Sequence, residues 1–155
     1  MLSKLLIRRS FSSGSSALNM VQALPSYQKA LELAHDQNYE ASIGKLRDTM
    51  KELDTNVGKN TNLHLYINQR IASMQKITKD LSGVEDTFQS CIQIAEDNDV
   101  NKTLAKKGME HSRLQNIFEW QNNMLKFYLE TNLDKAIEYG YELKDEVGHM
   151  LQEPS

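Results

Sequence analysis

The feature that most constrains the fold is the spacing of apolar residues at every third or fourth position along most of the chain. The longest such run predicts one helix through six residues: Leu63, Ile67, Ile71, Met74, Ile77 and Leu81. This spacing places the side chains on one face of an α-helix. No stretch alternates apolar and polar residues as a strand does, and only 2 prolines and 7 glycines interrupt the 155 residues. The sequence therefore predicts an all-α protein.

Breaks in this pattern lie near residues 36–38, 80–82 and 130–132, and they divide the helices into pairs. Pro25 suits the first turn of a helix, where its missing N–H costs nothing, and Asn38 suits an N-cap. Ser82 and Glu85 have the spacing of a capping box. The stretch 100–130 fits one long helix or two helices broken near Gly108. Because short connections favour antiparallel neighbours, we expect three antiparallel helical hairpins.

The N-terminus has a different composition from the rest of the chain. Residues 1–31 contain four bases and no acid, and the first acidic residue is Glu32. As a helix, residues 1–9 would place Leu2, Leu5 and Leu6 on one side. An acid-free, basic amphipathic helix of this kind resembles a mitochondrial presequence. A basic N-terminus with no targeting role is the alternative interpretation.

The end of this segment resembles a processing site. Arg9, Phe11 and Ser12 fit the pattern arginine, any residue, aromatic residue, then a small residue. The resemblance implies cleavage after Phe11. We therefore expect a presequence over residues 1–11, a flexible Ser/Gly-rich linker over 12–24, a helical domain over 25–151 and a tail over 152–155.

The charge balance limits the partners that we expect. The net charge is −3, and removal of residues 1–11 would leave 15 basic and 21 acidic residues, a net charge of −6. Phosphate binding needs clustered lysine and arginine, so nucleic acid is not the expected partner. No apolar run approaches the length that spans a bilayer, which leaves peripheral association with the inner membrane as the expected membrane contact.

Two segments of the chain repeat one short pattern. Residues 38–43, with the sequence NYEASI, align with residues 132–137, with the sequence NLDKAI, and each opens the second helix of a pair. The pattern resembles the second half of a tetratricopeptide repeat, with Ser42 and Ala136 at the small position. Ala30 stands at the small position of the first helix, although the family's Trp-x-x-Leu-Gly-x-x-Tyr pattern is absent.

The spacing of the repeat is irregular, with 42 residues from Ser42 to Val84 and 52 from Val84 to Ala136. We interpret the chain as a degenerate array over residues 25–151. The resemblance implies a short tetratricopeptide-like α-solenoid of three stacked hairpins, whose extended surface binds peptides or serves as a scaffold.

No pattern in the sequence indicates catalysis, a cofactor or a metal. The histidines (His35, His64, His111 and His149) lie in four segments, without the spacing that puts two ligands on one helical face. We interpret them as solvated surface residues. Cys91, the single cysteine, falls in an apolar stripe and reads as a small core residue. An enzyme remains the outside alternative.

One segment, residues 114–129, carries a candidate partner surface. Its apolar arc spans about 180°, more than a single neighbouring helix requires. In one interpretation the helix packs between two neighbours. In the other, Trp120 and Phe127 form an exposed aromatic anchor, with Gln121 beside them as a polar contact.

These observations predict a non-catalytic accessory or scaffold subunit of a large mitochondrial assembly, such as a respiratory-chain complex or the ATP synthase. We expect it in the matrix or on the matrix face of the inner membrane, bound to protein subunits. A component of the mitochondrial ribosome and a transient assembly chaperone or adaptor are the alternatives.

Overall fold

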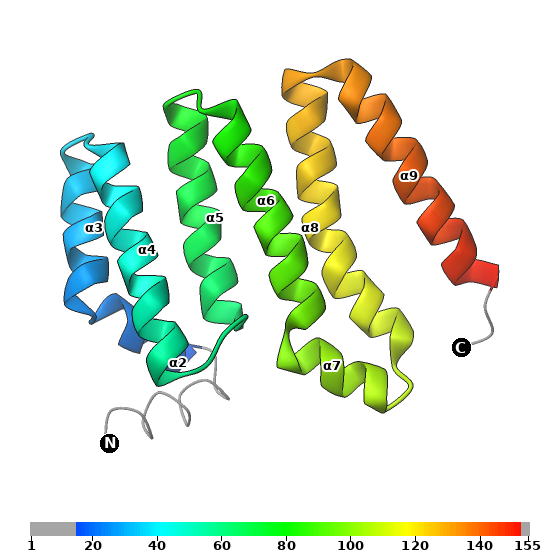
Figure 1. The fold of residues 1–155 in the computed structure, drawn as a ribbon, viewed down its shortest axis with the longest axis horizontal. Helices are drawn as coiled ribbons and strands as arrows, with labels where there is room; N and C mark the ends of the chain where they lie inside the picture. The colour runs from blue at the N-terminus through cyan, green and yellow to red at the C-terminus, as the bar shows by residue number, and fades with distance from the viewer. Residues whose placement is uncertain (1–14, 153–155) are drawn as a thin grey trace. The chain divides into compact units, whose positions relative to one another are not determined.

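The protein is all-α in the part of the chain that its structure, a computed structural model, describes, residues 15–152 (Figure 1). The helices in this range are α2 (Ser15–Gln22), α3 (Pro25–His35), α4 (Tyr39–Asn56), α5 (Asn62–Ile77), α6 (Leu81–Asp97), α7 (Asp99–Lys106), α8 (Glu110–Thr131) and α9 (Leu133–Gln152). The all-α prediction and the three predicted breaks are confirmed. The stretch 100–130 contains two helices, which are separated at Gly108.

The chain divides into two compact units, residues 1–80 and residues 81–155. Helices α2–α5 belong to the first unit and helices α6–α9 to the second. In the first, α3 packs on α4, α4 packs on α5, and α2 contacts α3 and α5. In the second, α8 contacts α6, α7 and α9. The residues that we expected to form the middle hairpin fall on both sides of the boundary.

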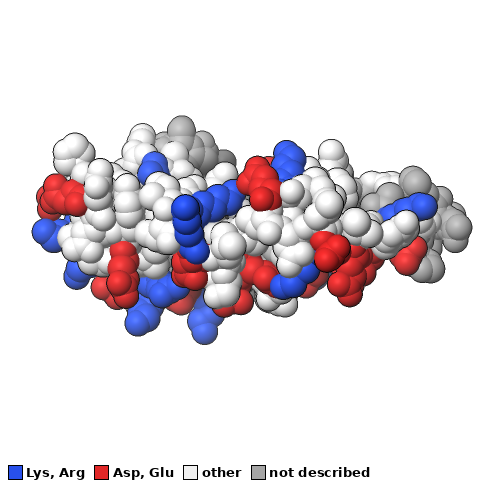
Figure 2. All heavy atoms as spheres, turned by 90° about the horizontal axis from the view of Figure 1, so that it is seen from above, with Lys and Arg blue, Asp and Glu red and all other residues white. Residues whose placement is uncertain are grey.

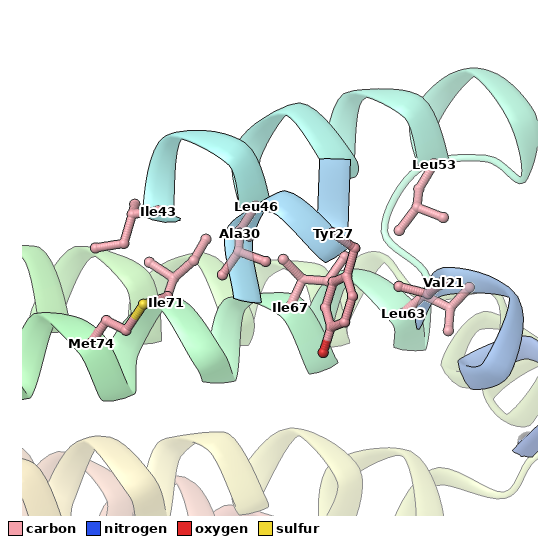
Figure 3. Close-up of a cluster of buried hydrophobic side chains, with 10 residues drawn as sticks. All are labelled: Val21, Tyr27, Ala30, Ile43, Leu46, Leu53, Leu63, Ile67, Ile71 and Met74. Atoms are coloured by element: carbon pink, nitrogen blue, oxygen red, sulfur yellow. The ribbon is translucent and has the colours of Figure 1, made fainter. Parts of the chain in front are cut away.

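The core of the first unit follows from the apolar spacing of its helices. Figure 3 shows the buried apolar side chains of this core, which come from α2, α3, α4 and α5: Val21, Tyr27, Ala30, Ile43, Leu46, Leu53, Leu63, Ile67, Ile71 and Met74. Full burial of a large apolar side chain contributes about 1.5–3 kcal/mol. The predicted stripe of α5 is buried only as far as Met74, because Ile77 ends the helix and both Ile77 and Leu81 are exposed.

Small residues allow α3 and α4 to approach closely. Ala30 and Ser42, which we aligned with the small positions of the repeat, are both buried. The Ser42 hydroxyl donates a hydrogen bond to the Ala30 carbonyl oxygen at 2.6 Å. A larger side chain at either position would force the two helix backbones apart.

Helices α3, α5 and α7 end in the same way. The N–H groups of Asn38, Asp80 and Met109 donate to carbonyl oxygens five residues earlier, at 2.8, 2.9 and 2.8 Å. The residue before each donor has a positive φ: 63° at Gln37, 59° at Lys79 and 72° at Gly108. This motif reverses the chain and caps the last carbonyl groups. It explains the breaks near residues 36–38 and 80–82.

One capping prediction is confirmed in position, and the other differs from the structure. Asn38 occupies the N-cap of α4, but its side chain does not bond the helix. Helix α6 begins at Leu81, so Ser82 lies inside it, and Glu85 makes an ion pair with Lys135 instead of capping. The N-cap side chain of α7, Asn98, does bond its helix: its oxygen accepts from the Val100 N–H at 2.9 Å.

The core of the second unit comes from α6, α8 and α9. Its buried apolar residues are Val84, Phe88, Cys91, Ala95, Ile117, Met124, Phe127, Tyr128, Ala136 and Leu143. Cys91 is fully buried, which confirms its interpretation as a core residue, and burial raises the pKa of its thiol to about 12. A thiol with so high a pKa is protonated at neutral pH and is a poor nucleophile.

The predicted flexible linker over residues 12–24 contains a helix in its described part. Residues Ser15–Gln22 form α2, and Val21 is buried in the core of the first unit. The Ser/Gly-rich composition suggested a linker, but burial of Val21 stabilises a helix here. The predicted processing residues Arg9, Phe11 and Ser12 lie outside the described residues.

Candidate binding cavity and exposed helix face

The second unit contains a cavity of about 300 Å³ between α6, α8 and α9. Its lining residues are Gln89 and Ile92 of α6, Met124 and Tyr128 of α8, and Lys135, Glu138, Tyr139 and Glu142 of α9. This volume is at the lower end of the range for ligand pockets.

Two tyrosines form one wall of this cavity. Their rings, on Tyr128 and Tyr139, have centroids 5.6 Å apart and an interplanar angle of 76°. Burial, followed by the charges of Glu146 and Glu142, raises the pKa of Tyr139 to about 12. Burial, followed by a hydrogen bond to Glu85, raises the pKa of Tyr128 as well. Both side chains are therefore neutral phenols at neutral pH.

The rim of the cavity carries charged side chains from α9. The Lys135 ammonium lies 3.2 Å from a carboxylate oxygen of Glu85 and 5.7 Å from the centroid of the Tyr128 ring. Glu138 and Glu142 are exposed, and neither forms an ion pair with a basic residue in the described part of the chain. The rim is therefore acidic.

The outer face of α9 is apolar and exposed. Leu133, Ile137 and Tyr141 follow one another at four-residue intervals, and their exposed fractions are 62%, 53% and 65%. Ala136 and Leu143 point the other way, into the core. Tyr139, between them, packs its ring against Tyr128 of α8, so this side of α9 meets the neighbouring helix and the side with Leu133 and Ile137 does not.

Phe127, one of the two residues of the predicted aromatic anchor, is buried. Phe127 has only 3% of its surface exposed, and its ring lies 6.2 Å from that of Phe88, edge to face. Trp120 is half-buried, and the Gln121 amide donates to Glu146 on α9 at 3.1 Å. Helix α8 packs against both α6 and α9, which accounts for its wide apolar arc. Phe127 is therefore a core residue.

His64 also differs from its prediction as a solvated surface residue. Its ring is buried, with one nitrogen 2.7 Å from the Asp54 carboxylate and the other 2.8 Å from the Thr61 hydroxyl. Thr61 and His64 together form a capping box at the start of α5. The spacing of Thr61 and His64 was the available signal, but histidine is an unusual partner for this motif.

Within the described residues, no group of three or more histidine, cysteine, aspartate or glutamate side chains could hold a metal ion. No helix described here is long and apolar enough to cross a membrane. Comparison of this chain with family models, with curated proteins and with solved structures found no match.

Proposed function

We propose that this protein is a non-catalytic accessory or scaffold subunit of a large mitochondrial assembly, such as a respiratory-chain complex or the ATP synthase. Its helices form a short tetratricopeptide-like array that binds neighbouring subunits. It acts in the matrix or on the matrix face of the inner membrane.

The exposed apolar face of α9 is the observation that carries this proposal. Three large apolar side chains at four-residue intervals along one face of α9, Leu133, Ile137 and Tyr141, are more than half exposed. Contiguous exposed apolar surface on a soluble protein, when it is large, marks a site where a protein, a ligand or a membrane binds. Aromatic residues such as Tyr141 often contribute most of the binding energy at interfaces.

Two further observations support the location and the array. The mitochondrial location rests on the acid-free, basic N-terminal segment and on Arg9, Phe11 and Ser12. The array is supported by Ala30 and Ser42, the small positions of the repeat-like pattern, which are buried where α3 and α4 meet. Stacked helix pairs of this kind leave an extended surface for partners.

The native size of the protein in detergent-solubilised mitochondria tests the proposal. We expect the wild-type protein to migrate in a complex far larger than its own 17.8 kDa, together with subunits that mass spectrometry identifies. The variant Ile137→Asp/Tyr141→Asp should dissociate from that complex, because charged groups cannot enter an apolar interface without a large desolvation penalty.

The matched control is Leu31→Asp/Ile77→Asp, which places two charges on exposed apolar positions of the first unit. This variant should remain in the complex. Migration of the wild-type protein near its own mass would contradict the proposal. Comigration with ribosomal subunits would assign the protein to the mitochondrial ribosome instead.

A further inference from the structure

The cavity of the second unit has an unbalanced charge. Lys135, its one basic lining residue, is already paired with Glu85. Glu138 and Glu142 lie four residues apart on α9 and have no ion-pair partner among the described bases. Like charges at this spacing repel each other and destabilise the helix slightly. A cation bound between them would remove that repulsion.

The aromatic wall also favours a cation. The face of a neutral aromatic ring attracts positive charge within about 6 Å of its centroid. Lys135 already uses the Tyr128 ring in this way, at 5.7 Å. The adjacent Tyr139 ring lies nearly perpendicular to Tyr128 and has no cation over it in the described part of the chain. The carboxylates of Glu142 and Glu146 that oppose ionisation of Tyr139 create a field that attracts a cation.

We propose that this cavity binds an arginine side chain from a basic segment of a partner protein, with its guanidinium between Glu138, Glu142 and the Tyr139 ring. The inference rests on the proposed function and names the chemistry of the partner. A guanidinium fits better than an ammonium because it is planar, stacks on aromatic rings and binds carboxylates through two N–H groups at once. A cavity of about 300 Å³ admits a long side chain.

The charge of the whole unit favours such a partner. Residues 81–155 contain 7 basic and 14 acidic residues, a net charge of −7. Acidic side chains predominate over this unit in the space-filling view (Figure 2). An acidic surface raises the rate at which a basic segment finds its site, and it opposes acidic partners.

Binding of a fluorescein-labelled peptide of alternating arginine and alanine to the purified full chain tests the proposal. Two further peptides carry lysine or glutamate in place of arginine. We expect the arginine peptide to bind most tightly, the lysine peptide more weakly, and the glutamate peptide not at all. In the variant Glu138→Gln/Glu142→Gln, affinity for the arginine peptide should fall about tenfold, because its charged hydrogen bonds are lost.

The matched control is Glu119→Gln/Asp145→Asn, which removes the same charge from exposed positions of α8 and α9 outside the cavity. It should lower affinity by less than about twofold, since only long-range attraction changes. Tyr139→Leu should weaken binding about threefold through loss of the ring, whereas Tyr139→Phe should leave it unchanged. Thermal unfolding of each variant shows whether the unit remains folded.

Equal losses in the two double variants would overturn the proposal, because they would show attraction to the overall charge rather than a site. Equal affinity for the arginine and glutamate peptides would overturn it as well. Neither outcome affects the native size of the protein in mitochondria, which depends on the outer face of α9. Failure of the cavity site is therefore distinguishable from failure of the proposed function.

Discussion

The two units are built from similar helices but differ in what they leave exposed. Residues 1–80 contain 11 basic and 7 acidic residues, whereas residues 81–155 contain 7 basic and 14 acidic residues. In the first unit, Arg70 and His64 each form a cluster of hydrogen bonds with side chains of the same unit. In the second unit, the two cavity carboxylates, Glu138 and Glu142, and the apolar face of α9 are exposed to solvent. The binding surfaces that we propose therefore lie in the second unit.

The aromatic clusters illustrate the difference. In the first unit, the Tyr66 hydroxyl accepts two hydrogen bonds from Arg70, at 3.0 and 3.1 Å, and lies 3.2 Å from the Tyr27 hydroxyl. The Arg70 guanidinium also lies over both rings. This cluster already contains its own cation. In the second unit, Lys135 pairs with Glu85 and lies over the Tyr128 ring. Tyr139 and the two cavity glutamates, Glu138 and Glu142, are therefore available to another cation.

Matched isoleucine substitutions should give the largest contrast. Ile67 is fully buried in the core of the first unit, and Ile137 is exposed on α9. Ile67→Ala should reduce the free energy of unfolding by about 2–5 kcal/mol, because it removes buried methyl groups and leaves a cavity. Ile137→Ala should change it by less than about 0.5 kcal/mol. Native-state hydrogen exchange of the α5 and α9 amides measures each effect.

The contrast fails if Ile137→Ala destabilises α9 as strongly as Ile67→Ala destabilises α5. That result would show that the outer face of α9 contributes to folding rather than to binding.

The buried histidine of the first unit should give the next largest effect. His64→Ala leaves the Asp54 carboxylate and the Thr61 hydroxyl without their present partner. Loss of these hydrogen bonds should cost about 1–3 kcal/mol of unfolding free energy. The control His35→Ala, at an exposed position at the end of α3, should cost less than about 0.5 kcal/mol. Urea unfolding followed by circular dichroism measures both, and equal costs would contradict a structural role for His64.

The helices could be predicted from the sequence, but the cavity could not. Helix positions and breaks depend on local signals such as the spacing around Ile67, so the helices could be predicted. The cavity depends on which helix faces meet. Phe127 and Tyr128 are adjacent in sequence and both lie on the wide apolar arc of α8, but only Tyr128 lines the cavity. The pairing of Glu85 with Lys135 joins residues 50 positions apart, which no periodicity reveals.

Alkaline pH should destabilise the second unit more than the first. Unfolded tyrosines ionise near pH 10, so the stability that Tyr139 contributes is fully present below pH 10 and is lost as the pH rises through about 12. Tyr128 shifts in the same direction. In the first unit, burial raises the pKa of Tyr27 to about 12. The pKa of Tyr66 is lowered, because hydrogen bonds from Tyr27 and Arg70 outweigh its burial, and this opposes the effect of Tyr27.

Fluorescence of Trp120, the single tryptophan, reports on the second unit during urea unfolding. We expect the urea midpoint to be lower at about pH 11 than at about pH 8. The decrease should be smaller in Tyr139→Phe, which has no phenol to ionise at this position. An identical fall in wild type and variant would show that other groups cause the alkaline sensitivity.

The smallest effects should come from the helix ends, where the two units use the same motif with different residues. Lys79 holds a left-handed φ of 59° at the end of α5, where Gly108 holds 72° at the end of α7. A side chain in this conformation costs about 1 kcal/mol relative to glycine.

Lys79→Gly should therefore raise the free energy of unfolding of the first unit by about 0.5–1 kcal/mol, and Gly108→Ala should lower that of the second unit by a similar amount. No atom lies within 4 Å of a Cβ added at Gly108, so the loss would arise from backbone strain rather than from a clash. If Lys79→Gly is neutral or destabilising in urea unfolding, the lysine side chain makes a compensating contribution that glycine cannot, and the two helix ends are not equivalent.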